Sequence, residues 1–236
     1  MRSVFLLALI LTLTAYTPHS PAYIEKMSAV MTSQQVQGGK SVTVKGQLFY
    51  QQNGNLVTRF TFPKEFLVIS NKVGEVKVYD PQKNSVLAYQ NFVFSTQSTQ
   101  FYYFFSGKSS DMGLTDIGYV PEKTYNEGDL AVTIWKQKVP DKKSQVHRVK
   151  LVFQNQQPVY MHYEDARGKV FRKVYYYKYL QLENTRFPSV TTEIVYSELA
   201  KDSTVTRTTY SDFRLNHLAD NSYMNYKIPA NAKIEK

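Results

Sequence analysis

Short segments of alternating apolar and polar residues, separated by turn residues, follow one another along most of the chain. In Leu56–Phe62 the even positions face one way and the odd positions the other, and the even positions are largely apolar. Such close spacing predicts antiparallel hairpins. We expect strands at Ser41–Gln51, Leu56–Phe62, Phe66–Ser70, Glu75–Tyr79, Ser85–Gln90, Leu130–Val139, His147–Gln154, Gln157–Glu164, Lys169–Leu180, Val190–Ser197, Ser203–Phe213 and Ser222–Ile228.

Helix is scarce beside so much predicted sheet. We expect a short helix within Tyr23–Met31 and an amphipathic aromatic helix over Thr99–Ser106, capped by hydroxyl residues and ended by Gly107. Ser110–Ile117 is a weaker candidate for another helical turn. Flat sheets of more than about ten strands are unusual, so one large antiparallel sheet should curl. Because so little helix can cover it, the sheet either closes tightly or leaves a cavity.

The first residues are typical of a cleaved secretory signal. Arg2 precedes the apolar run Val4–Ala15, and small residues lead to a cleavage point after Ala22. The apolar run is shorter than the roughly 20 residues that a membrane span needs. We therefore expect residues 1–22 to be removed and residues 23–236 to form a single exported domain.

Composition narrows the choice of partner. The chain has no cysteine, which excludes disulfides and a lipid-modified N-terminal cysteine. Lys plus Arg number 29 against 19 Asp plus Glu. This balance favours an acidic partner such as anionic lipid, while export argues against nucleic acid. The simpler interpretation, solvated outer positions of strands, remains open.

Signals for catalysis are weak. His147, His162 and His217 have no metal-ligand spacing, and no phosphate-binding or nucleophile motif occurs. The pair Glu164–Asp165 precedes Arg167 and Gly168 and is typical of a turn. The tyrosine-rich stretch Val174–Leu180 favours a strand over a sugar-stacking surface. We predict no enzyme, no catalytic residue, no metal and no cofactor.

The order of several short motifs is similar to a known family. Gly46–Phe49 opens a strand, Leu56–Phe62 ends at Pro63, Phe66–Ser70 ends in a polar turn, and Val76–Tyr79 ends in Asp80-Pro81. Together with the tail Met224–Ile234, this order resembles the LolA-like outer-membrane lipoprotein carriers. The resemblance implies an open, incomplete β-barrel with short helices covering the mouth. It also implies a soluble periplasmic carrier that takes acylated lipoproteins from an inner-membrane exporter to an outer-membrane acceptor.

On this basis we expect the apolar face of the sheet to bind acyl chains, in a monomer. The predicted ligand-binding residues of the sheet are Leu56, Phe60, Phe62, Val68, Val76, Val78, Val132, Ile134, Val149, Leu151 and Met161, and those of the helical lid are Phe101, Phe104 and Phe105.

One departure from the family and two alternatives bear on this prediction. Family carriers have a basic residue and a proline before the second strand, where this chain has Gln52-Asn53-Gly54, so an arginine-latched lid is not expected on these residues. The same curled sheet suits an envelope sensor or regulatory module that binds a protein or lipid partner. A glycan-binding protein would instead use Tyr175–Tyr179 and the pair Glu164–Asp165.

Overall fold

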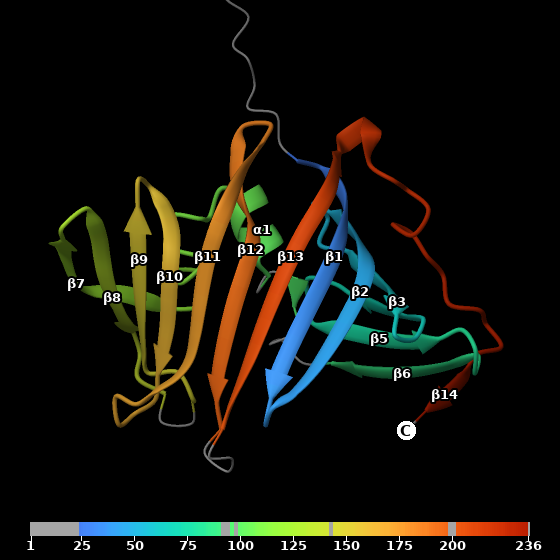
Figure 1. Ribbon diagram of the computed structural model, residues 1–236, viewed down its shortest axis with the longest axis horizontal. Helices are drawn as coiled ribbons and strands as arrows, with labels where there is room; N and C mark the ends of the chain where they lie inside the picture. The colour runs from blue at the N-terminus through green and yellow to red at the C-terminus, as the bar shows by residue number, and fades with distance from the viewer. Residues whose placement is uncertain (1–23, 91–94, 97–98, 142–143, 198–201, 236) are drawn as a thin grey trace, which may run out of the picture.

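The computed structural model describes residues 24–90, 95–96, 99–141, 144–197 and 202–235. The expected signal peptide, residues 1–22, lies outside this part of the chain. Figure 1 shows one long sheet that curls around a short helix, with the C-terminal segment crossing its other side.

The sheet contains every strand of the described chain, in the order β14-β6-β5-β4-β3-β2-β1-β13-β12-β11-β10-β9-β8-β7. All pairs are antiparallel except β14 with β6. β14 and β7 are the two edge strands of the sheet and do not pair with each other, so the barrel is open. This confirms the predicted fold class. The strands are β1 Lys26–Gln37, β2 Lys40–Gln51, β3 Leu56–Phe62, β4 Phe66–Ser70, β5 Glu75–Asp80, β6 Ser85–Gln90, β7 Tyr119–Glu127, β8 Leu130–Gln137, β9 Arg148–Gln154, β10 Gln157–Glu164, β11 Val170–Leu182, β12 Thr185–Tyr196, β13 Ser203–Leu215 and β14 Lys233–Glu235.

The predicted N-terminal helix is wrong, because these residues form β1. Met27, Ala29 and Met31 are all buried and follow the two-residue period of a strand. β1 lies between β2 and β13 with long antiparallel pairing on both sides. Tertiary pairing therefore decides a segment whose apolar residues also fit a short helix.

Two further predictions differ from the structure, and one strand was missed. Residues 110–117 form turns rather than helix, since the Asp111 carboxylate accepts hydrogen bonds from the backbone of Gly113 and Thr115. β7 was not predicted at all. The strand expected at Ser222–Ile228 is irregular backbone that packs on the sheet without joining it.

One helix, α1 (Gln100–Phe105), confirms the aromatic helix predicted from the sequence. Its N-cap is Thr99, whose side chain accepts a hydrogen bond from Tyr102 N. We call the face of the sheet that carries α1 the inner face and the opposite one the outer face. Figure 1 shows α1 behind β12 and β13, within the curl.

The larger core fills the inner face around α1. Phe101, Phe104 and Phe105 are each about 96% buried and surround Phe187 of β12, which is fully buried. Other members of this core come from β1, β2, β8–β11 and the turns after α1. Burial of this aromatic surface is the main stabilising contribution of this half of the molecule.

A second core lies on the outer face of β2–β6. Phe49, Val57, Leu67 and Tyr79 point outward and are covered by a C-terminal segment that we call the strap, residues 219–232. Figure 1 shows this segment passing from the end of β13 down the outer side of β2 and β3 to β14. Among its side chains Met224 is 2% exposed.

Candidate functional site

The inner face of β3–β6 carries a set of apolar side chains, which we call the wall: Phe60, Phe66, Val68, Val78 and Leu87. The strand register builds it, because Val68 of β4 lies opposite Val78 of β5, and Val78 lies opposite Leu87 of β6. Phe60 pairs with Phe66, and their rings stack at 4.3 Å between centroids. The alternation of β3 is broken at Thr61, because Phe60 lies opposite Gly46 of β2 and Phe62 lies opposite the adjacent Lys45. Phe62 therefore faces outward, and its prediction as an inner-face residue is wrong.

The wall is not covered as a core would be. Leu87 is 38% exposed, and the other four side chains are only half-buried. The same strands already bury Val57, Leu67 and Tyr79 on their outer face under the strap. Folding of this half therefore does not require the apolar residues of the inner face. An exposed apolar patch of this kind marks a binding surface.

Most of the sheet residues predicted to bind a ligand share the inner face. Leu56 and Val76 flank the wall and are buried, while Phe60, Val68 and Val78 belong to it. On the other half of the sheet, Val149, Leu151 and Met161 are inner residues of the filled core. The structure thus brings together five predicted residues around the wall and three beneath the helix. Ligand contact by any of them stays a prediction.

Val132 and Ile134 lie elsewhere. Val132 pairs with Val152, and Ile134 pairs with Lys150, whereas the inner positions of β8 include Trp135, which pairs with Val149. Both predicted residues therefore face outward, away from the wall. The cause is that apolar side chains occupy both faces of β8, so the sequence pattern does not identify the inner one.

Two wall residues were missed by the sequence analysis, Phe66 and Leu87. Phe66 shares the alternation of Val68, and Leu87 sits two positions before Tyr89 on the same face of β6. A register for the hairpins would have placed both opposite predicted residues. That register depends on the turn lengths, which fix which residues of two strands are opposite.

The predicted lid helix is packed closely in this structure. Phe105 lies 5.5 Å from the Tyr50 ring, and Phe104 contacts Tyr176 at 6.4 Å, both between ring centroids. Burial raises the pKa of Tyr50 to about 12, with a smaller contribution from Tyr102. The phenols around α1 are therefore neutral at physiological pH. The aromatic rings of the helix contact β2 and β11–β13.

An ion pair, Arg172 with Glu193, lies on the inner face beyond the helix. Arg172 Nε donates to Glu193 Oε1 at 2.5 Å, and its Cζ lies 4.9 Å from the centre of the Tyr163 ring. Both side chains are more than a third exposed. The pair neutralises itself, so the inner face presents no net charge at this point.

His162 lies on the outer face, and both nitrogens of its ring have hydrogen-bonding partners. Its Nδ1 lies 3.0 Å from the Tyr160 hydroxyl and its Nε2 2.9 Å from Glu164 Oε1. All three residues belong to β10, at alternate positions of one strand. Both ring nitrogens thus have partners on the same strand, and these three residues do not include the serine or cysteine nucleophile of a catalytic triad. Within the described residues, no group of three or more His, Cys, Asp or Glu could hold a metal ion.

His162 should make stability pH-dependent. Burial, with Lys150 and Lys173 adding to it, lowers the pKa of His162 against the opposing effect of Glu164. The unfolded chain then binds the proton more readily, so stability is highest above about pH 6.5 and falls as the pH decreases. We expect His162→Gln to lose less stability than wild type between pH 7 and 5 in urea titrations. Equal losses would contradict this assignment.

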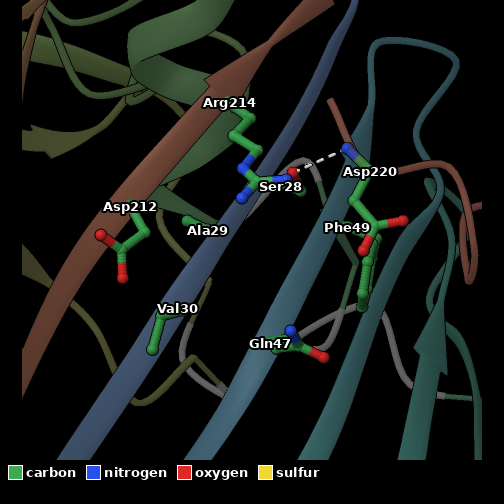
Figure 2. A pocket seen from close by; sticks show the side chains of 8 residues that line it. All are labelled: Ser28, Ala29, Val30, Gln47, Phe49, Asp212, Arg214 and Asp220. Carbon is green, nitrogen blue, oxygen red and sulfur yellow. Dashed lines mark hydrogen bonds between the residues drawn. The ribbon is translucent and has the colours of Figure 1, made fainter. Parts of the chain in front are cut away.

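Three cavities among the described residues differ in size. The first, of about 180 Å³, lies between β13, β1, β2 and the start of the strap (Figure 2). The second, of about 280 Å³, lies near His147 and the turn at Gly168. The third, of about 340 Å³, lies beside Phe104 and the turns at Asn155 and Asn184. Only the third exceeds the roughly 300 Å³ at which small-molecule sites begin.

The smallest cavity has a structural role. Figure 2 shows Asp220 reaching across to Ser28 of β1, whose hydroxyl oxygen accepts a hydrogen bond from Asp220 N at 2.9 Å. Backbone and side-chain hydrogen bonds from Ser222 lower the pKa of Asp220, with Arg214 contributing. These contacts attach the strap where it leaves η3 (Asn216–Leu218). In the described part of the chain, no helix is long and apolar enough to cross a membrane.

Comparison with solved structures identifies the fold. A LolA superfamily protein from Nitrosomonas europaea superposes with a TM-score of 0.57 at 14% identity, over 84% of this chain and 89% of the other. A protein from Vibrio parahaemolyticus described as an outer membrane lipoprotein-sorting protein domain gives 0.57 at 15% identity, over 85% and 89%. A DUF1329 family protein from Desulfovibrio piger gives 0.56 at 14%, over 86% and 90%. No protein-family model and no curated protein sequence matches the chain.

Proposed function

We propose that this chain, whose fold is LolA-like, is a periplasmic carrier that binds the acyl chains of lipoproteins on its inner face and moves them toward the outer membrane. The wall is the observation that carries the proposal. Its strands bury one apolar face under the strap and leave a second apolar face open within the curl. A protein that binds nothing apolar has no use for that second face.

The proposed ligand suits the chemistry of the wall. Aliphatic and aromatic side chains offer no hydrogen bonds and no charge, so they select hydrocarbon. Each buried CH₂ contributes about 0.8 kcal/mol. Shielding roughly ten of them gives about 8 kcal/mol, near micromolar affinity before ordering is subtracted. Such affinity permits release to an acceptor. The proposal includes no catalytic step.

Helix α1 supplies the second element of the proposal. It covers the inner face of β11–β13 next to the wall, and its buried aromatic side chains pack against the sheet there. We infer that an acyl chain enters along the wall and displaces α1 to reach the space it fills. The Phe101, Phe104 and Phe105 rings would then contact the ligand as predicted from the sequence.

A pair of substitutions tests the wall directly. In the variant Val78→Asp/Leu87→Asp, two opposed inner residues gain carboxylates, whose desolvation opposes contact with hydrocarbon. We expect the affinity for a fluorescent C16 fatty acid to fall at least 10-fold. The measurement is fluorescence titration of the mature protein, with thermal unfolding to verify that each variant is folded.

The matched control changes a valine pair on the outer face. Val36 of β1 lies opposite Val205 of β13, and Val36 is 40% exposed. Val36→Asp/Val205→Asp adds the same charge to the same type of position and should keep wild-type affinity. The proposal fails if the wild-type protein binds no fatty acid. It also fails if both double variants bind alike.

A further inference from the structure

The cavity of about 340 Å³ lies at the end of α1, away from the wall residues, and it differs from them in chemistry. Phe104 and Tyr179 contribute its aromatic side chains and Pro158 its aliphatic part. Around them stand the carboxamides of Asn155, Gln156, Gln157 and Asn184. Among its described lining residues the one charged side chain is Arg186. This lining of hydrogen-bonding groups with a single positive charge suits a polar ligand that carries a carboxylate.

The guanidinium of Arg186 is held in place. With the Gln157 amide oriented so that its oxygen faces the guanidinium, that oxygen accepts hydrogen bonds from Arg186 Nε at 2.8 Å and Nη1 at 2.5 Å. No carboxylate lines the cavity to neutralise the charge. A positioned guanidinium without an acidic partner binds carboxylates well, because its planar donors match the two oxygens.

The carboxamide of Gln156 lies in the cavity lining because of a strained turn between β9 and β10. Asn155 and Gln156 are the two central residues of the β9–β10 hairpin, with φ of 49° and 62°. A two-residue turn with both φ values positive strongly favours glycine at its second position. Gln156 retains a side chain there at a cost in backbone energy. Strain of this kind is retained where the side chain has a use, and this side chain lines the cavity.

We propose that this cavity binds an acidic peptide segment, namely the peptide part of the acylated cargo, an inference that rests on the proposed carrier function. Carboxamides pair with peptide N–H and C=O groups, and Arg186 binds an Asp or Glu side chain of the ligand. A sugar is a poorer match, because Phe104 is only 3% exposed and presents no free ring face for stacking. Phe104 belongs to α1, so the peptide would bind beside the helix that the acyl chain displaces.

Two fluorescent N-palmitoyl peptides test the inference, one with Asp and Glu side chains and one with Asn and Gln in their place. Wild-type protein should bind the acidic peptide roughly 10-fold more tightly, the effect of a hydrogen bond to a charged group. Arg186→Gln should abolish the difference. Arg207→Gln, which removes an exposed arginine from the outer face of β13, should leave it unchanged.

Gln156→Gly supplies a second, opposite readout. Glycine adopts the positive φ without strain, so Tm should rise by about 2–4 °C, while affinity for the acidic peptide should fall about 3-fold. A residue that only shapes the turn would raise Tm and leave binding unchanged, which would contradict the inference. Equal binding of both peptides by wild type would overturn the inference alone. Binding of neither peptide would overturn the carrier function with it.

Discussion

Phe187→Ala is expected to lower the free energy of unfolding by about 3–5 kcal/mol. Phe187 is fully buried at the centre of the larger core, with ring centroids of Phe101, Phe104 and Phe105 within 5.3–5.5 Å. Removing the ring leaves a cavity and deprives all three helical aromatic side chains of one shared partner. Since whole domains are stable by only about 5–15 kcal/mol, the loss is a large share of the total.

Urea denaturation followed by far-UV circular dichroism measures this change. The control is Phe62→Ala, the same substitution at a residue that is 51% exposed, for which we expect a change below about 1 kcal/mol. If Phe187→Ala unfolds with nearly wild-type free energy, the aromatic cluster does not hold α1 in place. The displacement of α1 by a ligand would then need another explanation.

The position of Phe187 shows where sequence reasoning was limited. The predicted strand began only at Val190, whereas β12 begins at Thr185 and contains Pro188, a residue that is unusual in a central strand. The structure tolerates the proline through a local irregularity. Lys178 has φ 54° and does not pair regularly, and the Ser189 hydroxyl donates to its carbonyl oxygen at 2.6 Å. These contacts join residues of two different strands, so the sequence pattern of either strand alone does not predict them.

The wall illustrates the opposite case. Alternation in Leu56–Phe62 correctly predicted that Phe60 shares a face with Leu56, and the pairing of β3–β5 puts Val68 and Val78 on that face. It failed at Phe62, because the irregularity at Thr61 turns that side chain to the other face. The sequence could not reveal which apolar face would be open, because that depends on the strap. Ser222–Ile228 looked like another strand, yet the strap that contains these residues covers Phe49, Val57 and Leu67 from outside. A half-sheet with two apolar faces and one cover necessarily leaves the other face open.

Met224→Ala should therefore weaken the strands that carry the wall, although Met224 lies on the opposite face of the sheet. Met224 belongs to the strap and is only 2% exposed, because it packs on the sheet. Its truncation should lower the free energy of unfolding by about 2–5 kcal/mol. Because the apolar side chains of the strap pack on the outer face of β2–β6, we expect faster amide hydrogen exchange in β3–β5 and unchanged exchange in β9–β11. Fatty-acid affinity should fall in parallel, since the wall needs the register that these strands hold.

Leu218→Ala is the matched control for that variant. Leu218 is 66% exposed just before the strap, so exchange and affinity should both stay at wild-type values. If Met224→Ala loosens β3–β5 and the fatty acid still binds with full affinity, the ligand lies beneath α1 and not on the wall. If exchange rises equally in β9–β11, the two cores unfold together, and the strap stabilises the whole sheet. The wall is then an ordinary part of one cooperative unit, and its exposed side chains need another reason to be apolar.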